Sequence, residues 1–574
     1  MLAIGAISTP LNAQELPSFD IPSGPMSEAL AVFAEQADME ILYTDREMHG
    51  VVANSVEGHL TLAAALALLI EGTGLEFVQI NSVFVVRRIE VASLPPEAPA
   101  PERAADAGRA VTQNLAPDDE VIVLGSNIRG AGSAAAPLHV YSRRDIEQSG
   151  AFSIQDFART LPYNLDFSDS TGAGFAGPAS GVGGAGAGVN LRGLGEDATL
   201  TLINGRRVAF GGGGGGFVDI SLIPVDAVKR ISIVSDGASA IYGADAVAGV
   251  VNIEMLDGYD GAKTNFQLGA VTDGGLRQAL ASQFAGKSWG DAQVFGGYEF
   301  LGSTPLDSRR RAISAEAADP TDLLPHRERH SVVFGASASP SDRIELEAFG
   351  LYSHSDTQFR LADSTAGAGK ENTDSALLFS ELAATYMFPG GWAAEVSAVY
   401  SRNKTDSRRV SAEIVTFDIA SRTRSASLEL KADGPLAQIP GGAIRLAAGG
   451  QFRAEGFVRS TRIESEEIAD ISRKSLAGFL EVNFPLVSEL NRRDGIEALS
   501  LTVASRLERY SDFGAAANPK AGLRYVPLRD VALRATIGSS FQAPGFFDLG
   551  RGQSSLPLPG AFFAPPPDND APLP

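Results

Sequence analysis

Few residues of this sequence stand at spacings that enzymes or metal sites use. His326-Arg-Glu-Arg-His330 carries histidines at i and i+4, which on a helix would share one face and could bind a metal. They lie among charged residues at a strand boundary, so we predict an exposed loop. Gly181–Gly186 matches GxGxxG in letters, but it follows no hydrophobic strand and opens no helix. No nucleophile stands beside a base, and we predict no enzyme, catalytic residue, metal site or cofactor.

The composition excludes further classes of function. The chain has 574 residues, of which 44% are hydrophobic and 20% charged, so it can bury a large core. Asp and Glu number 69 against 47 Lys and Arg, which gives a net charge of −22. Such acidity argues against a nucleic-acid partner, whose phosphates need basic residues. The lack of cysteine excludes disulfides and thiolate metal sites.

The N-terminal residues indicate export from the cytoplasm. Met1–Ala13 resembles the second half of a secretory signal peptide without its basic region, and a frayed terminus is the alternative. No later stretch approaches the ~18–20 uncharged apolar residues of a membrane helix. An exported chain can still cross a membrane as a closed β-barrel, whose strands need only ~9–11 residues each.

Residues 16–90 read as a compact α/β domain with a doubled unit. Leu30–Ile41 lines up with Leu66–Phe77, 36 residues later, and each copy begins with helical periodicity and then enters a strand. Pro25 and Thr61 stand where helix starts are expected. The pattern predicts two β-α-β halves. The proline- and alanine-rich stretch at 91–118 reads as an extended, semi-rigid linker.

The middle of the chain mixes short helices and strands with glycine-rich loops. We expect helices at 143–149 and around 153–161, and strands at 199–203 and 229–235. Six consecutive glycines at 211–216 form a loop with no conformational preference of its own.

From about residue 262 to 540, strand-length segments alternate apolar and polar residues. We count about fourteen of them, and several exceed ten residues, such as Arg343–Ser353 and Ala498–Tyr510. Outer-membrane barrels need this alternation because apolar residues face lipid and polar residues face the lumen. A soluble β-sandwich or propeller also alternates and is the competing interpretation.

Four segments follow one another in an order and spacing that carry a specific resemblance. They are Val189–Gly195, Leu200–Val208, Ile223–Val234 and Asp236–Ile253. The series resembles the plug domain of TonB-dependent outer-membrane receptors. Residues 16–90 resemble the short N-terminal domain shared by secretins and signal-transducing receptors, and 540–549 resembles a motif that recurs in the barrels of the family.

The resemblance implies a mainly β fold: a large antiparallel transmembrane β-barrel, incomplete here, with an α/β plug and a small N-terminal βαβ-βαβ domain. The expected parts are a signal-peptide remnant at 1–15, the N-terminal signalling domain at 16–90, a linker at 91–118, a TonB box at 119–125, a plug at 126–256 and a partial barrel at 257–574.

The resemblance also assigns residues to two sites. The TonB box would be Glu120, Val121, Ile122, Val123 and Leu124, an exposed strand able to join a partner's sheet; an ordinary first strand of the plug is the alternative. The plug motif comprises Arg192, Gly193, Asn204, Gly205, Arg206, Asp236, Gly237, Tyr242, Gly243 and Asn252.

Two departures from the family pattern affect these expectations. The family has an arginine where Ser235 stands, and that arginine and the one at Arg192 pair with barrel glutamates, so only Arg192 is left for this lock. Large plugged barrels have about 22 strands. With about fourteen here we expect a C-terminally truncated barrel that does not form a working pore by itself, because lipid cannot satisfy open sheet edges.

The expected function is energised uptake of a scarce ligand, a ferric siderophore or similar iron complex, across the outer membrane of a Gram-negative bacterium. Its partners would be the periplasmic TonB complex, outer-membrane lipid and the ligand. An inner-membrane anti-sigma regulator would contact residues 16–90 in the periplasm, unless that domain is only structural. A receptor for a saccharide or other nutrient is the first alternative, and a secretin-like secretion subunit is the second.

Overall fold

The computed structural model describes residues 18–37, 40–42, 51–59, 62–70, 73, 75–80, 83–88, 124–129, 136–165, 186–212, 214–314, 321–363, 367–463 and 466–549. The chain divides into two compact units, 1–115 and 116–574. Glu120, Val121, Ile122 and Val123, the expected signal peptide and the expected linker lie outside the described residues.

The described part of the N-terminal unit contains two helices and three small sheets. Strand β3 pairs in parallel with β7, which pairs antiparallel with β6, and the pairs β1–β5 and β2–β4 complete the unit. The elements are β1 Ser18–Ile21, β2 Gly24–Pro25, α1 Met26–Ala37, β3 Glu40–Leu42, β4 Val52–Ala53, β5 Val56–His59, α3 Leu62–Ile70, β6 Leu75–Ile80 and β7 Val83–Arg88.

The helix starts of this unit follow their sequence signals. Helices α1 and α3 begin directly after Pro25 and Thr61, as predicted. Their apolar faces share one core, in which Phe19 and Phe33 stack with ring centroids 5.1 Å apart. The unit therefore has a hydrophobic core of its own.

In the first part of the second unit, the described residues form a plug of five strands and three short α-helices, with the strand order β10-β9-β12-β11-β8. The helices and strands expected at 143–149, 153–161, 199–203 and 229–235 are all confirmed within one or two residues. The elements are β8 Leu138–Ser142, α4 Arg143–Gln148, α5 Ile154–Arg159, β9 Thr199–Ile203, β10 Arg206–Arg207, β11 Val228–Val234, α6 Ser239–Tyr242 and β12 Gly249–Met255.

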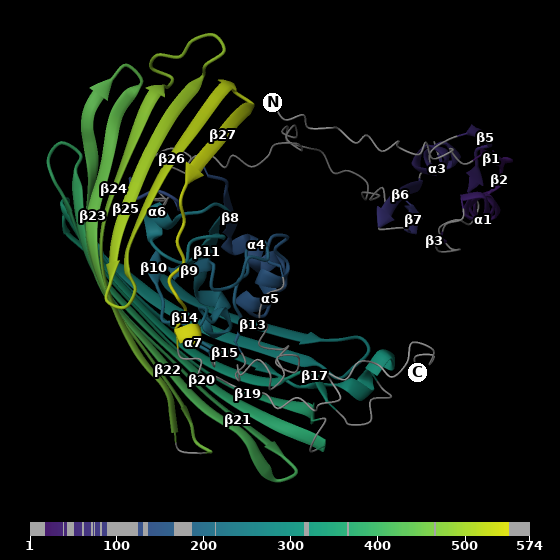
Figure 1. Cartoon of the computed structure of the whole chain (residues 1–574), viewed down its shortest axis with the longest axis horizontal. Coiled ribbons are helices and arrows are strands. Elements are labelled where there is room, and N and C mark those ends of the chain that lie inside the picture. Colours follow the sequence, from purple (N-terminus) through teal and green to yellow (C-terminus); the bar gives the residue numbers. More distant parts are fainter. Residues whose placement is uncertain are drawn as a thin grey trace, which may run out of the picture. The chain divides into compact units, whose positions relative to one another are not determined.

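Thirteen antiparallel strands form one large curved sheet, with the plug on its concave side (Figure 1). Neighbours in sequence pair in order from β13 to β27, and β16 (Leu306–Asp307) pairs separately with β17 (Asp322–Leu324). The strands are β13 Gly261–Ala270, β14 Arg277–Trp289, β15 Ala292–Ser303, β18 His326–Ser341, β19 Ile344–Asp363, β20 Gly367–Met387, β21 Ala393–Ser411, β22 Ile414–Ile439, β23 Gly442–Thr461, β24 Glu466–Val487, β25 Ala498–Tyr510, β26 Gly514–Leu528 and β27 Val531–Gly538.

Alternation along the strands separates the two faces of this sheet as the sequence predicted. On β24, Leu476 and Leu480 are 63% and 47% exposed on the convex face, whereas Phe479 and Glu481 are buried against the plug. The convex face is therefore apolar where a membrane would contact it, and the concave face is polar and covered. The soluble sandwich is excluded, since the plug lies against one face of a single sheet.

The two ends of the sheet differ. At one end, here called the short-turn end, most connections are brief, such as 290–291, 342–343 and 440–441. At the opposite end, β15 and β18 are separated by 304–325. Transmembrane barrels have short periplasmic turns and longer extracellular loops. The other connections of the opposite end are also short, so it is the single long connection 304–325 that favours the short-turn end as the periplasmic side.

The loop predicted for 326–330 is wrong. His326 begins strand β18, and Arg327 and Arg329 on that strand turn toward the concave face, where both are buried. Alternating charges resembled a loop because the sequence does not show that the plug covers them.

No helix of the described residues is long and apolar enough to cross a membrane.

Candidate functional site: the contact between plug and sheet

The β9–β10 hairpin directs one arginine into a group of acidic side chains on the sheet. Asn204 and Gly205 at its tip have φ of 51° and 75°, a combination that suits a tight type I′ hairpin. The following residue, Arg206, pairs with carboxylates from three neighbouring strands of the sheet. They are Glu381 at 2.7 Å, Glu429 at 3.3 Å and Glu395.

Two asparagines of the plug motif fix this hairpin. The buried Asn252 accepts a hydrogen bond from the Gly205 amide through Oδ1, at 2.7 Å. Asn204 Oδ1 accepts from the Met255 amide at 2.9 Å. Both bonds hold the hairpin against β12. The side chain of Arg206 therefore extends toward the glutamates from a fixed backbone.

A second contact joins buried charges of the sheet to the main chain of the plug. Glu299 accepts from the amides of Val225 and Asp226 at 3.2 and 2.8 Å. Arg329 forms an ion pair with Glu299 and donates to the Ser221 carbonyl at 2.7 Å. Glu299 and Arg329 are 1% and 0% exposed, so the plug completes the solvation of this buried pair.

The N-terminal end of the described plug is held at the short-turn end of the sheet. Glu481 accepts from the Ser126 hydroxyl at 2.6 Å and from the Asn127 amide at 2.7 Å. Arg129 donates through Nε to Asp433 at 2.9 Å. The chain therefore enters the plug from the side to which the short turns belong.

Of the expected TonB-binding residues 120–124, Leu124 is the one that the structure describes. It is 1% exposed and packs in a plug core cluster with Leu200, Val234 and Val250. The next residue, Gly125, donates its amide to the Tyr242 hydroxyl at 2.9 Å. Any segment offered to a partner therefore ends before Leu124, and the assignment of 120–123 stays a prediction.

The Asp236-Gly237 turn of the plug motif is held by the distant strand β26. Lys520 donates from Nζ to an Asp236 carboxylate oxygen and to the Gly237 carbonyl, both at 2.7 Å. Gly243, at φ 87°, lies so close to β25 that a Cβ would stand 2.6 Å from Glu508 Oε1. Both turns of the motif therefore touch the sheet directly.

Among the described residues, Arg192 forms no ion pair with a glutamate of the sheet, in contrast to the lock that the resemblance implied. Its guanidinium donates to the Ala248 carbonyl within the plug at 2.6 Å, and Arg192 and Gly193 both have positive φ. Arg206 carries the ion pairs to sheet glutamates instead. Ser235, at the position of the missing arginine, has a buried hydroxyl with no hydrogen-bond partner among the described residues.

The glycine run is an ordered part of this contact. The Gly211 amide donates to the Phe217 carbonyl at 2.6 Å, and the Ser421 hydroxyl of β22 donates to the Gly212 carbonyl at 3.2 Å. A Cβ at Gly215 would stand 2.7 Å from the Phe457 ring of β23. Glycine is required here because the loop lies directly against the sheet.

At the end of the sheet opposite the short turns, aromatic rings surround an arginine. Arg473 lies 5.0 Å from the ring centroids of both Phe513 and Phe546, and its Nε is 2.8 Å from Asp512. Phe546 belongs to the short helix α7 (Phe546–Leu549) and stacks on Phe457. We call Phe457, Arg473, Tyr510, Phe513 and Phe546 the aromatic–arginine cluster.

The segment that leads to this cluster also touches the plug. The Phe541 carbonyl accepts from the Asp245 amide at 3.0 Å. Gln542 donates from its side chain to Asp197 at 2.6 Å. The motif at 540–549 thus connects the plug to the aromatic–arginine cluster.

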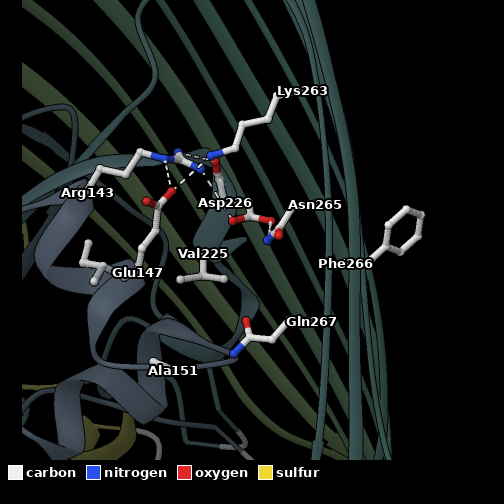
Figure 2. A pocket seen from close by; sticks show the side chains of 10 residues that line it. Arg143, Glu147, Ala151, Val225, Asp226, Lys263, Asn265, Phe266 and Gln267 are labelled. Carbon is white, nitrogen blue, oxygen red and sulfur yellow. Dashed lines mark hydrogen bonds and ion pairs between the residues drawn. The ribbon is translucent and has the colours of Figure 1, made fainter.

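A pocket of about 330 Å³ separates helix α4 from the first strand of the sheet (Figure 2). Glu147 lies between Arg143 at 2.9 Å and Lys263 of β13 at 3.1 Å. Asp226 accepts from the Asn265 side chain at 2.9 Å. Partial burial favours the neutral form of Glu147, but the hydrogen bonds from Lys263 and Arg143 outweigh it and hold its pKa below the ordinary 4.5.

Sequence reasoning found the plug residues and missed their partners on the sheet. The signal was present, since each partner is a charged residue at an inward position of an otherwise alternating strand. This pattern does not identify the plug residue that each charged side chain contacts. Among the described residues, no three histidine or carboxylate side chains gather as metal ligands would. The missed residues are Glu299, Arg329, Glu381, Glu395, Glu429, Asp433, Glu481, Glu508 and Lys520.

Two family models match this chain. The model of the TonB-dependent receptor plug domain matches residues 131–250. The model of the TonB dependent receptor-like β-barrel matches residues 257–570. A curated relative, the vitamin B12 transporter BtuB of Vibrio vulnificus, is 26% identical over 188 residues, which cover 33% of this chain and 29% of the relative. The chain thus aligns with less than a third of that relative's length.

Solved structures share the fold at low sequence identity. The siderophore receptor PirA of Acinetobacter baumannii gives a TM-score of 0.55 at 14% identity, over 71% of this chain and 61% of that one. A variant of the ferric enterobactin receptor of Pseudomonas aeruginosa gives 0.55 at 15%, over 72% and 63%. The outer-membrane ferripyoverdine receptor of Pseudomonas aeruginosa gives 0.50 at 14%, over 91% and 70%.

Proposed function

Because the chain belongs to the TonB-dependent receptors, a family of outer-membrane receptors and transporters, we propose that it imports a scarce ligand with energy supplied by TonB. The observation that carries this proposal is the plug held against the concave face by buried charges. A ligand that follows this face must displace the plug or rearrange it. Breaking buried ion pairs needs an energy source, and the outer membrane has none of its own.

The proposed route for that energy is the segment 120–123. It precedes Leu124, the point at which the chain enters the plug core at the short-turn end. A β-prone strand that adds to a partner's sheet edge is gripped through main-chain hydrogen bonds. A pull on 120–123 would reach Ser126 and Arg129, whose bonds to Glu481 and Asp433 are the nearest contacts to the sheet.

The proposed ligand is a ferric siderophore or a similar iron complex. The aromatic–arginine cluster is itself covered, since Phe457, Arg473, Tyr510 and Phe546 are 1%, 5%, 3% and 2% exposed, so it supports the proposal only by its position. The cluster lies at the end opposite the short turns, where an external ligand would arrive. The solved receptors that share this fold are named for ferripyoverdine, ferric enterobactin and siderophores.

A nutrient other than iron is the second candidate. The observation that favours it is the match to a vitamin B12 transporter, which covers 33% of this chain. A saccharide receptor would share the same plug contacts.

Residues 16–90 are proposed to signal from the periplasm to an inner-membrane anti-sigma regulator, with 91–118 as the tether. The separate core of this unit supports a domain that folds and acts by itself. Deleting 16–90 should abolish ligand-dependent transcription and leave uptake intact. Unchanged transcription in that deletion strain would contradict the signalling role.

Uptake measurements in a strain with and without the gene test the ligand. Radioactive ferric siderophores, labelled cyanocobalamin and a labelled maltodextrin would be offered separately, and expression would be measured under iron starvation. We expect gene-dependent uptake of a ferric chelate and induction when iron is scarce. Gene-dependent uptake of cobalamin or sugar, with no response to iron, would overturn the iron proposal. Gene-dependent uptake that continues while the proton gradient is dissipated would overturn energised import.

A further inference from the structure

Four basic side chains form a block on the convex face of the sheet. In the register of β21 and β22, Arg402 stands directly opposite Arg424, and Lys404 directly opposite Arg422. On β21, Asn403 stands between Arg402 and Lys404 and is buried on the concave face. The side chains of the block therefore point away from the plug. The three arginines are exposed.

Three of these four cations are not neutralised by the described part of the chain. Like charges directly opposite each other destabilise an antiparallel pair. Lys404 has Asp406 at 2.7 Å and Asp374 at 3.6 Å. Arg402, Arg422 and Arg424 make no ion pair or hydrogen bond to any described residue. An anion from outside the chain would relieve this repulsion.

The block lies where the lipid-facing surface ends. Strand β21 reaches Arg402 nine residues after it begins at the short-turn end, and a barrel strand crosses a bilayer in ~9–11 residues. Between the block and the short-turn end, the outward residues of both strands are apolar. Tyr400, the outward residue next to Arg402 on β21, suits the aromatic girdle of a barrel. These outward residues are Ala394, Val396, Ala398, Tyr400, Ala426, Leu428, Leu430 and Ala432.

We propose that Arg402, Arg422 and Arg424, assisted by Lys404, bind the phosphate groups of a phosphorylated glycolipid in the outer leaflet of the membrane. The planar guanidinium donates two parallel hydrogen bonds to phosphate, which a lysine cannot do. The acyl chains of the same lipid would lie on the apolar rows below, led by Val396 and Leu428, which are 43% and 53% exposed. A lipid has both a phosphate group for the basic block and acyl chains for the apolar rows, a combination that a protein partner does not require at the membrane boundary.

The first test needs only the unaltered full chain, purified from outer membranes in detergent. Native mass spectrometry would compare diphosphoryl lipid A with the same lipid stripped of phosphate, and add inorganic phosphate as a competitor. We expect at least tenfold preference for the phosphorylated lipid and little competition by inorganic phosphate. Equal retention of the two lipids would overturn the proposal, and displacement by inorganic phosphate at equal concentration would reduce the site to a simple anion site and overturn the lipid assignment.

The second test locates the site. Exchanging Arg402, Arg422 and Arg424 for Gln should lower retention of diphosphoryl lipid A at least tenfold, and exchange for Lys should give an intermediate loss. The matched control changes Arg343, Arg493 and Arg529 to Gln, since these are exposed at the short-turn end. Equal losses in both triple variants would overturn the assignment. If the triple variant does not assemble, the single change Arg424→Gln must still weaken retention.

Discussion

Arg206 faces three carboxylates within a largely covered lumen. The side chains of Arg206 and Glu381 are only 14% and 8% exposed, so water screens this attraction weakly. Lys431 adds a second cation 3.0 Å from Glu395. Two cations therefore face three carboxylates, and removing one of the cations increases the excess of buried negative charge. This position determines how firmly the plug is held.

Replacing Arg206 by Gln should destabilise the plug–sheet contact by about 3–5 kcal/mol, because it leaves partners charged and buried. Thermal unfolding of the detergent-purified protein measures the effect, expected as a fall of several degrees. The control is Arg129→Gln, whose side chain is 27% exposed and whose partner Asp433 keeps Arg445 at 3.5 Å. Equal losses in the two variants would contradict a special role for Arg206.

Glu147 gives a pH-dependent contribution at the same scale. Since its pKa in the folded protein lies below 4.5, it stabilises fully above pH 4.5 and loses this effect as pH falls through the lowered pKa. Its side chain is 49% exposed, so the contribution should be below about 1 kcal/mol. We expect Glu147→Gln to melt about a degree lower than the unaltered protein at neutral pH, and by less at pH ~3, because the deficit shrinks as pH falls through the lowered pKa.

The control for this measurement is Asp260→Asn, whose pair with Lys287 is exposed and 3.9 Å long. Its melting temperature should track that of the unaltered protein at both pH values. A deficit in Glu147→Gln that persists unchanged in acid would show that the carboxylate charge is not responsible.

Single elements were predictable wherever the signal was local. Strand β25 has the expected bounds, Ala498–Tyr510, because period-two alternation and flanking turns are written in one stretch of sequence. The glycine run at 211–216 could not be interpreted in this way, since its conformation is imposed by Phe217 on the plug and Phe457 on the sheet. Likewise, Lys520 and Asp236 are 284 positions apart, and no local pattern pairs them.

Adjacent glycines of this run should respond differently to a methyl group. Gly215 has φ +63° and no room beside Phe457, whereas a Cβ at Gly216 would meet nothing within 4 Å. We expect Gly215→Ala to destabilise by about 1–3 kcal/mol, from strain and displacement of the ring. Gly216→Ala should change stability by less than about 0.5 kcal/mol. Melting temperatures of the two variants, compared side by side, decide whether the loop is packed in solution.

The whole molecule joins two compact units, 1–115 and 116–574, through a stretch rich in proline and alanine. The sequence predicted the large sheet well, about fourteen strands against thirteen observed. It could not predict how the plug lies against the sheet, because that depends on contacts between distant residues. The proposed transport belongs to this scale, since it would require force to pass from 120–123 through the plug to the sheet.

Proline at Val123 should therefore abolish ligand uptake and leave ligand binding at the cell surface intact. Proline removes the backbone N–H and fixes φ, which prevents strand addition to TonB. Proline at Ala107 in the linker is the control and should change neither property. Uptake and surface binding of the same labelled ligand, measured on whole cells, separate the two steps. Normal uptake with proline at Val123 would exclude 120–123 as the coupling segment.

The bonds of Arg329 and Glu299 to the plug end on main-chain atoms, the carbonyl of Ser221 and the amides of Val225 and Asp226. A backbone atom offers the same acceptor or donor whatever side chain the residue carries. Plug and sheet can therefore diverge in sequence at this contact without losing their fit. A chimaera that combines this sheet with another receptor's plug should still assemble, provided that the backbone path at 221–226 is kept.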